Sequence, residues 1–304
     1  MLSICIPIFN HVSEYLIFQL EQQADEIDQA IEIILFDDHS EQDMQAVYKK
    51  FAGLKYISIH KSDKNLGRAG ARNRLADLSK HKYLLFIDAD SETRTDDFLS
   101  RYLDAAEKNT VCCGGTIYQK EKPDPDKLLR WKYGRARETV SAEKRNKNPW
   151  QQFTTHHFLI DKSVFQEIRF SESIPGYGHE DSLFGYHLMK RNIRIKHIDN
   201  PLYHTGLEPS DVFLEKSKKA LDNLIRLYHD PSLDEDFKHY IRLLDFYEKQ
   251  RKAGLLWLWK AGYRHFRNAL KRNLKGNYPK IIIFDLYKFS YFAYHIKKAP
   301  DNEK

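Results

Sequence analysis

Short apolar runs recur along the first two hundred residues, and each is followed by a polar turn and a segment with helical spacing. β-branched and aromatic side chains dominate four of these runs and predict strands at 3–9, 32–38, 56–61 and 83–90. The alternation of such strands with helices is typical of an α/β architecture with a mostly parallel sheet. Longer insertions separate three later strand-like runs, at 111–119, 156–160 and 193–198. We therefore expect the second half of the sheet to be mixed.

The hydrophobic pattern changes after Gly206, where the strand signals stop. Helical spacing continues in three segments, at 209–229, 233–250 and 253–275. The pattern thus predicts a first domain over 1–206 and a helical extension over 207–304. Within the first domain, residues 120–152 carry three prolines and many charges, which indicates a partly helical, mobile excursion over the edge of the sheet.

A final apolar run at 281–298 is nearly long enough to cross a bilayer. Asp285 and Lys288 lie inside it, and a charge is costly at the centre of a membrane. We expect this segment to lie at a membrane interface or to pack within the protein.

Composition narrows the class of protein. The chain has 304 residues, of which 41% are hydrophobic and 13% aromatic, and this apolar content is too high for a disordered or collagen-like chain. The three cysteines, Cys5, Cys112 and Cys113, include an adjacent pair that could form a disulfide only in a strained ring, which favours a reducing compartment such as the cytoplasm. The opening apolar run lacks a charged leader and is interrupted by Pro7 and Asn10, unlike an ordinary signal peptide.

The net charge of +6 is unevenly distributed. Residues 251–304 contain 13 Lys and Arg against 3 Asp and Glu, so the rest of the chain is slightly acidic. A protein that binds nucleic acid through its main domain would carry a basic face there, so nucleic acid is not an expected partner.

The basic segment includes an amphipathic helix over 253–275. One stripe of this helix is apolar and consists of Trp259, Tyr263, Phe266, Leu270 and Leu274. Lys and Arg side chains lie off the stripe. Positive charge beside the amphipathic rings of Trp257, Trp259, Tyr263 and Phe266 favours docking of residues 251–304 on an anionic membrane surface, peripherally at its inner face. In the alternative, the stripe packs on the first domain or on a second subunit of a homo-oligomer.

Acidic residues end two of the predicted strands. Asp37 and Asp38 follow the second strand, and Asp88 and Asp90 follow the fourth, at the carboxyl edge where open α/β sheets bind ligands. Alternate strand residues point to the same side, so Asp88 and Asp90 would be about 7 Å apart on one face. Two such carboxylates can chelate Mg²⁺ or Mn²⁺, and the ion can in turn bind a diphosphate. In the alternative, Asp88 and Asp90 have no ligand and belong to a solvated turn after a buried strand.

Five motifs occur in order along the chain: SICIPIFN at 3–10, ILFDDHSEQD at 34–43, NLGRAGARN at 65–73, FIDADSE at 86–92 and, from residue 176, GYGHEDSLFG. As a set they resemble the inverting family 2 glycosyltransferases of GT-A fold, which share an opening strand with Pro and Asn, a DD-x-S turn, an N-x-G-x-x-x-ARN helix, a DxD and a late ED-x-x-F segment. The resemblance covers roughly residues 1–206. It implies a Rossmann-like α/β domain that transfers a sugar from a nucleotide sugar.

The resemblance also implies roles for residues around the nucleotide. The first strand would end beneath the nucleotide, at Pro7, Phe9 and Asn10. Asp38 would accept the uracil N3–H of a UDP-sugar, because a carboxylate is an acceptor where the base offers a donor. Gly67 would let the backbone pass close to the nucleotide.

Further implied roles concern the diphosphate and a metal. Arg72 and Asn73 would lie at the start of the helix behind the nucleotide, where Arg72 would contact phosphate or pair with a carboxylate at the sheet edge. Asp88 would face the ribose or a metal-bound water, and Asp90 would bind the metal. His204, in the PLYHTG segment, would bind the metal or the diphosphate, and imidazole suits Mn²⁺ better than Mg²⁺. A solvated surface histidine is the alternative for His204.

The paired carboxylates Glu180 and Asp181 begin a predicted helix. The helix dipole alone would favour acidic residues there without any catalytic role. The resemblance implies that Asp181 is the general base for the acceptor hydroxyl and that Glu180 holds or orients the acceptor. Gly176 and Gly178 would give the preceding loop the freedom to fold over the substrate.

The sequence therefore predicts a metal-dependent, inverting glycosyltransferase that moves a sugar from a UDP-sugar to a hydroxyl of a glycan or a lipid-linked glycan. FIDADSET also fits the DxDx(T/S) signature of haloacid dehalogenase-type phosphatases. These phosphatases need a later Lys and a second acidic pair at a strand end, whereas the later pair here, Glu180 and Asp181, begins a predicted helix. A degenerate glycosyltransferase-like module that only holds a nucleotide, or that scaffolds a polysaccharide complex, is a third hypothesis. A structural role is expected for His156 and His157, since neighbouring positions on a strand face opposite sides.

Overall fold

The structure, a computed structural model, describes residues 1–296, and the chain forms two compact units. Unit 1 comprises residues 1–118, 138–173 and 180–206. Unit 2 comprises residues 119–137, 174–179 and the described chain from Leu207 onward. The division at Gly206 that the sequence suggested therefore needs one correction, since two segments before it belong to unit 2.

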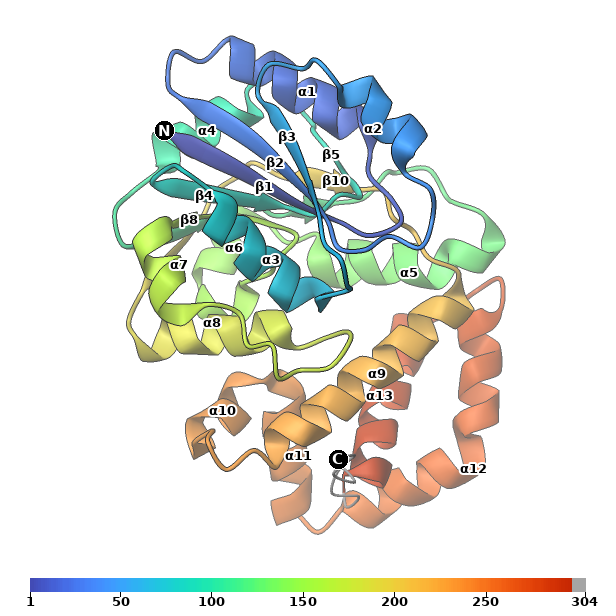
Figure 1. Ribbon diagram of the computed structural model, residues 1–304. Helices are drawn as coiled ribbons and strands as arrows, with labels where there is room; N and C mark the ends of the chain where they lie inside the picture. Colours follow the sequence, from blue (N-terminus) through green and yellow to red (C-terminus); the bar gives the residue numbers. More distant parts are fainter. Residues whose placement is uncertain (297–304) are drawn as a thin grey trace. The chain divides into compact units, whose positions relative to one another are not determined.

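Unit 1 is built on a seven-stranded sheet in the order β3–β2–β1–β4–β8–β6–β9 (Figure 1). Only β8 runs antiparallel to its neighbours, so the α/β fold with a mostly parallel sheet, mixed in its second half, is confirmed. The strands are β1 Leu2–Ile8, β2 Ile31–Asp37, β3 Ile57–Lys61, β4 Tyr83–Ile87, β6 Thr110–Cys113, β8 His157–Asp161 and β9 Arg194–His197.

A second sheet of three short strands was not expected. It contains β5 (Ser91–Glu92), β10 (Leu202–His204) and β7 (Thr116–Ile117), with β10 in the middle. The run expected as one strand at 111–119 is broken because Gly115 adopts a left-handed backbone conformation, with φ +97°. Its two halves, β6 and β7, therefore join different sheets.

Helices cover both faces of the large sheet (Figure 1). One face carries α1 (Glu14–Asp25), α2 (Gln45–Phe51) and α4 (Phe98–Ala105), and the other carries α3 (Gly67–Leu78), α7 (Lys162–Ile168) and α8 (Glu180–Lys190). Neighbouring strand residues point to opposite cores: Ile4 and Cys112 lie in the first, and Cys5 and Cys113 lie in the second. All three cysteines are buried free thiols.

The excursion expected at 120–152 is largely helical. It contains α5 (Leu128–Tyr133), α6 (Ala142–Asn146) and short 3₁₀ or π turns at Pro125–Lys127, Gly134–Glu138 and Trp150–Gln152. Arg145 of α6 is buried in unit 1, where its guanidinium donates to the carbonyl oxygens of Cys113, Gly114 and Ile198 at 3.1, 2.9 and 2.9 Å. This side chain therefore binds the backbone carbonyls at the ends of β6 and β9.

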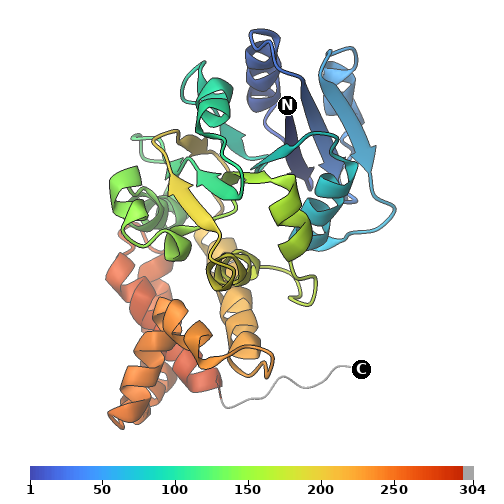
Figure 2. The ribbon, with the colours of Figure 1, turned by 90° about the vertical axis from the view of Figure 1, so that its left-hand side faces the viewer.

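Unit 2 is helical. Its main helices are α9 (Ser210–Tyr228), α10 (Glu235–Tyr240), α11 (Arg242–Lys252), α12 (Leu256–Lys275) and α13 (Ile281–His295). The helix expected at 233–250 is interrupted at Ile241, where the backbone is extended. The orange and red helices of this unit lie side by side in both views (Figures 1 and 2).

The apolar stripe expected on α12 is only partly buried. Tyr263 and Leu274 are buried, and Tyr263 packs against Tyr291 of α13 with ring centroids 5.7 Å apart. Trp259 packs edge-on against α13 as well. Phe266, in contrast, is 62% exposed. The stripe therefore marks the contact with α13 only in part.

The final apolar run forms α13, which packs within unit 2 through a largely buried side. Residues 297–298 of that run lie outside the described residues. Among the helices of residues 1–296, none is both long enough and apolar enough to cross a bilayer.

The turn after β6 generates a stability prediction. A Cβ atom at Gly114 would overlap the backbone oxygen of Asn200 and the His157 ring. Because backbone cannot give way cheaply, Gly114→Ala should lower the free energy of unfolding by about 1–3 kcal/mol. Gly262→Ala, in the interior of α12, is the matched control. Its Cβ would meet nothing within 4 Å, and Ala stabilises a helix interior by up to about 1 kcal/mol relative to Gly. Urea denaturation measures both, and equal stability of the two variants would contradict the packing at Gly114.

Candidate functional site

The candidate site begins at the carboxyl edge of the large sheet. β2, β1 and β4 are adjacent and parallel, so the segments that follow them emerge at the same edge. These segments contain Phe9 and Asn10, Asp38, and Asp88–Asp90. The fold thus brings together the motifs expected to bind a nucleotide, at the edge where open α/β sheets bind ligands.

The backbone of Asp88–Asp90 is held from three sides. The Asp88 N–H donates to the carbonyl oxygen of His156 at 2.9 Å, and the Ala89 carbonyl accepts from the Ser13 N–H at 2.8 Å. The Asp90 carbonyl accepts both the N–H and the hydroxyl of Thr205, each at 2.8 Å. β4 ends at Ile87, before this motif, so Asp88 and Asp90 do not continue the strand as expected.

Asp90 and His204, the two expected metal ligands, lie together. Asp90 Oδ2 and His204 Nε2 are 3.6 Å apart. Burial opposes ionisation of Asp90, but attraction to His204, His156 and Arg68 outweighs it and holds the pKa of this carboxyl below its usual range. The carboxylate is therefore ionised at neutral pH, which is the state that a metal requires.

The donor set fits a hard divalent cation. A carboxylate oxygen beside an imidazole nitrogen suits Mn²⁺ better than Mg²⁺. In the part of the chain that the structure describes, no group of three or more His, Cys, Asp or Glu side chains is arranged to hold a metal ion. Asp90 and His204 would thus contribute two ligand atoms, with phosphate oxygens or water as the others.

The His204 ring contacts two other rings. It stacks on Tyr118 with centroids 5.5 Å apart and packs against His156 at 5.4 Å. The two ring nitrogens of His156 are hydrogen-bonded to the hydroxyls of Ser91 and Thr116, at 3.0 and 2.9 Å. Burial lowers the pKa of His156 to about 4, so its ring is neutral at pH 7. His156 therefore fixes the orientation of His204, a role that sequence analysis missed.

The neighbouring His157 has the structural role that was expected. Its ring is buried in β8 and is hydrogen-bonded to the Tyr102 hydroxyl at 2.7 Å and to the Gly115 carbonyl at 2.5 Å. The two adjacent histidines thus serve different parts of unit 1.

Asp38 and Asn10 organise the loops at the sheet edge. The Asp38 carboxylate accepts from the Leu66 N–H at 2.6 Å, just before α3. Desolvation raises the pKa of Asp38 despite such backbone hydrogen bonds. Asn10 Oδ1 accepts from the N–H groups of Glu41 and Gln42 at 2.7 and 3.1 Å. Asp38 keeps acceptor capacity for a ligand, since an ionised carboxylate has about four acceptor sites.

Pro7, Phe9 and Gly67 complete this edge. Pro7 lies within β1, opposite Phe36 of β2, and Phe9 is 46% exposed just beyond the strand. Gly67 begins α3 with φ +74°, and a Cβ there would meet nothing within 4 Å. The left-handed backbone by itself accounts for glycine at this position, and the close approach of a nucleotide stays a prediction.

Arg72 is a buried charge, with 1% of its side chain exposed. It lies in the middle of α3 and not at its start, which corrects the expectation for Arg72 and Asn73. Its Nη2 donates to Asp88 Oδ1 at 2.6 Å, so the ion pair at the sheet edge is present. Its Nε and Nη1 atoms have no hydrogen-bond partner among the described residues. Such donors are costly to bury unless an oxygen binds them, so a phosphate contact stays a prediction.

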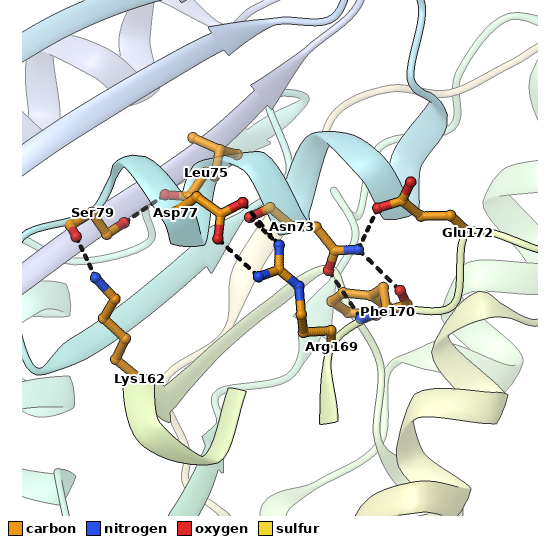
Figure 3. Close-up of polar contacts among 8 residues, drawn as sticks. All are labelled: Asn73, Leu75, Asp77, Ser79, Lys162, Arg169, Phe170 and Glu172. Carbon is orange, nitrogen blue, oxygen red and sulfur yellow. Dashed lines mark hydrogen bonds and ion pairs between the residues drawn. The ribbon is translucent and has the colours of Figure 1, made fainter. Parts of the chain in front are cut away.

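Asn73 fastens α3 to the segment after α7 (Figure 3). Its side-chain amide donates to the Phe170 carbonyl at 3.0 Å and to Glu172 Oε1 at 2.7 Å, and its oxygen accepts from the Phe170 N–H at 3.0 Å. One turn further along α3, Asp77 forms a bidentate ion pair with Arg169 at 2.8 and 2.9 Å. These contacts fix the helix that carries Arg72.

Sequence analysis also missed Arg68, which acts on the site. It lies in the first turn of α3 and is exposed, and its charge lowers the pKa of Asp90. Its place inside the NLGRAGARN motif was the available signal.

Glu180 and Asp181 open α8, as expected. Desolvation and then the charge of Glu180 raise the pKa of Asp181 to about 6, against hydrogen bonds from the Ser182 N–H and hydroxyl and the charge of Arg72. Burial and the charge of Glu180 would raise the pKa of this carboxyl whatever its role, and a pKa of about 6 is also one that suits a general base. Arg72 links Asp181 electrostatically to Asp88.

The segment before Glu180, residues 174–179, is anchored within unit 2. Asn223 of α9 donates to the carbonyl oxygens of Pro175 and Tyr177 at 2.9 and 3.0 Å. A Cβ at Gly178 would overlap Ala220 of α9. Gly178 therefore permits close packing, which differs from the freedom of movement that the sequence suggested.

Comparison with known proteins assigns the family. Residues 3–169, more than half of the chain, match the family model described as Glycosyl transferase family 2. The chain belongs to glycosyltransferase family 2. It is therefore an enzyme of the glycosyltransferase type. A relative, the amylovoran biosynthesis glycosyltransferase AmsB of Erwinia amylovora, is 36% identical over 99 residues, which make up 31% of this chain and 32% of that protein. The match thus spans about a third of that relative.

Solved structures of glycosyltransferases share the fold. The mannosyltransferase PcManGT from Pyrobaculum calidifontis, in complex with GDP-Man and Mn²⁺, has a TM-score of 0.59 at 14% identity over 99% of this chain and 88% of that chain. TarS from S. aureus has a TM-score of 0.51 at 17% identity, over 98% and 92%. Glucosyl-3-phosphoglycerate synthase from Mycobacterium tuberculosis, in complex with Mg²⁺ and uridine-diphosphate, has a TM-score of 0.51 at 15% identity, over 74% and 78%. At these identities the likeness concerns the fold, and it confirms the GT-A architecture.

The close approach of Gly206 to Asp90 generates a prediction. A Cβ atom at Gly206 would overlap the Asp90 carboxylate. Gly206→Ala should therefore displace that carboxylate from His204 and weaken Mn²⁺ binding in the presence of UDP about 10–100-fold. Electron paramagnetic resonance of Mn²⁺ measures this affinity. Gly262→Ala, with open space around its Cβ, should bind Mn²⁺ as the unmodified protein does. Unchanged affinity in Gly206→Ala would show that Asp90 does not hold the ion.

Proposed function

We propose that this family 2 enzyme transfers a sugar from a UDP-sugar, with inversion, to a hydroxyl of a glycan or a lipid-linked glycan. The observation that carries the proposal is the placement of Asp181. A carboxylate with a pKa of about 6 opens α8, and the buried Arg72, paired with Asp88, acts on it electrostatically. A base poised near neutral pH beside an edge suited to a diphosphate is what such a transfer needs.

The nucleotide would bind at the carboxyl edge of the sheet. Asp38 would accept the uracil N3–H with an acceptor site that Leu66 does not occupy, and the exposed Phe9 would contact the base. UDP-GlcNAc and UDP accompany two of the similar structures, those of TarS and glucosyl-3-phosphoglycerate synthase, whereas PcManGT holds GDP-Man. Guanine also presents N–H donors, so a donor panel must include GDP-mannose beside the UDP-sugars.

Asp90 and His204 would hold Mn²⁺ or Mg²⁺. When bound, the ion would neutralise charge on the departing diphosphate. Arg72, through Nε and Nη1, and Arg68 would donate to phosphate oxygens. Asp88, whose Oδ1 binds Arg72, would keep its other oxygen for the ribose or for a metal-bound water.

Asp181 would take the proton of the acceptor hydroxyl as its oxygen attacks the anomeric carbon. The new carbon–oxygen bond forms opposite the leaving group, so the configuration inverts. The bond between the anomeric carbon and the diphosphate breaks, and its electron pair leaves with UDP. Glu180, buried beside Asp181, would orient the acceptor, and its charge keeps the pKa of the base raised.

Two other functions have less support. A haloacid dehalogenase-type phosphatase needs a second acidic pair at a strand end, whereas Glu180 and Asp181 open a helix. A module that only holds a nucleotide would not need the raised pKa of Asp181. Release of UDP, of inorganic phosphate or of neither from UDP-sugars in Mn²⁺ distinguishes the three.

The metal site supports a prediction on donor binding. Asp90→Ala should weaken Mn²⁺-dependent UDP binding by about 100-fold or more while the fold persists, because it removes an ionised ligand from beside His204. Calorimetric titration with and without Mn²⁺ measures the loss, and circular dichroism checks the fold. Asp96→Ala, which removes an exposed carboxylate six residues further on, is the matched control. Equal UDP affinity in Asp90→Ala and the control would contradict the assignment.

The base supports a prediction on pH. The kcat/KM of transfer should rise with pH through about 6, because Asp181 can accept a proton only after it has lost its own. Asp181→Asn should retain donor binding, lose transfer by roughly 10²–10⁴-fold and lose this pH dependence. Glu180→Gln is the comparison variant, since it keeps the proposed base. A fully active Asp181→Asn enzyme would move the role of base to another group.

A further inference from the structure

Exposed apolar side chains are concentrated in unit 2. Of the fourteen large hydrophobic residues that are exposed within residues 1–296, eight lie between Leu255 and Tyr294. Three of them form an apolar tip at the start of α12, where Leu255 is 39%, Trp257 65% and Leu258 47% exposed. A cluster of this kind on a water-facing helix marks an interaction surface.

The same helix is strongly cationic. α12 carries six Lys and Arg residues and no Asp or Glu. Arg264 and Arg272 are exposed, and neither forms an ion pair within residues 1–296. Lys275, in contrast, pairs with Asp211 of α9. Arg264 and Arg272 are therefore available to an anionic partner.

The tip and the arginines share one side of the helix. At about 100° per residue, Trp257, Arg264 and Arg272 lie within about 80° of one another around the axis. Leu258 lies about 40° from Arg272, and the buried Tyr263 points toward α13 on the other side. Trp257, Leu258, Arg264 and Arg272 thus define an exposed surface, the Trp257 face, about 22 Å long with apolar side chains at one end.

We propose that the Trp257 face docks on an anionic lipid bilayer. Trp257 and Leu258 enter the headgroup region, and Arg264 and Arg272 pair with lipid phosphates and anionic headgroups. This arrangement narrows the docking surface that the sequence suggested, because Trp257 is exposed whereas Tyr263 and Leu274 are buried. The inference goes beyond the proposed transferase function and does not depend on it.

Charge complementarity favours a bilayer over other occupants of the face. A second copy of the chain, related by two-fold symmetry, would bring arginines against arginines. A nucleic acid would match the charge but offers no apolar phase for the exposed tip. An anionic bilayer offers both a negative surface and an apolar interior within a few ångströms of one another.

Vesicle sedimentation of the full chain tests the proposal. The protein should sediment with vesicles of phosphatidylcholine and phosphatidylglycerol at low salt and should not sediment with phosphatidylcholine alone. Raising the salt to 1 M shortens the screening length to about 3 Å and should release the protein. Equal sedimentation with neutral and anionic vesicles, or none with either, would overturn the proposal.

Charge reversal isolates the Trp257 face. Arg264→Glu with Arg272→Glu should lower the partition onto anionic vesicles by about tenfold or more. Lys49→Glu with Lys108→Glu changes the net charge equally on exposed positions of unit 1, and this control should bind as the unmodified chain does. Equal loss in both double variants would reduce the effect to net charge and overturn the proposal. Self-association without vesicles that the arginine variant abolishes would assign the face to a second copy.

Fluorescence tests the insertion of the tip directly. Bromine attached to the upper acyl chains should quench Trp257 in the vesicle-bound protein. Trp257→Phe should keep most of the binding and lose most of the quenching, because the other tryptophans are buried or half-buried. Undiminished quenching in Trp257→Phe would place a different part of the chain in the bilayer.

Discussion

Hydrogen bonds from three distant parts of the chain fix the backbone of Asp88–Asp90, just beyond the end of β4 at Ile87. An extended strand would have carried both carboxylates on one face. The turn instead sends Asp88 to Arg72 and Asp90 to His204, so that one carboxylate balances a buried cation and the other is available to a metal. Asp88 and Asp90 therefore have different partners because the backbone turns between them.

The buried charge of Arg72 then sets the electrostatics of the site. Burial and the charge of Glu180 both favour the protonated form of Asp181, and Arg72 opposes them. With the arginine in place the carboxyl has a pKa of about 6 and is mostly ionised at pH 7. Asp88 makes this possible, because a guanidinium with no partner carboxylate could not be buried at acceptable cost. The helix α3 is in turn held by Asn73 and Asp77, which is why a residue in mid-helix can act on the site.

Much of this fold could be predicted because buried strands carry a clear pattern. The seven strands of the large sheet all lie within or near the predicted runs, and the strand-end positions of Asp38 and Asp88 follow from them. The small sheet escaped prediction because strands of two or three residues have no detectable period. His156 and Arg68 escaped because they act on Asp90 and His204 through space, across segments that no local motif joins. The position of Arg72 was misjudged because the helix starts at Gly67, whose left-handed backbone is not visible in a sequence.

Apolar spacing along α12 shows a different limit of sequence patterns. A stripe of apolar residues indicates that a helix packs on something, but it does not say on what. Tyr263 and Trp259 pack on α13, which buries part of the stripe within unit 2 and leaves Phe266 exposed. Two further exposed side chains, Trp257 and Leu258, lie off that stripe, on the side of the helix that also carries Arg264 and Arg272. The apolar residues that pack on α13 and those that face solvent differ only in their exposure. Periodicity along the sequence therefore does not identify the surface that is available to a partner, whereas the packing of α12 on α13 does.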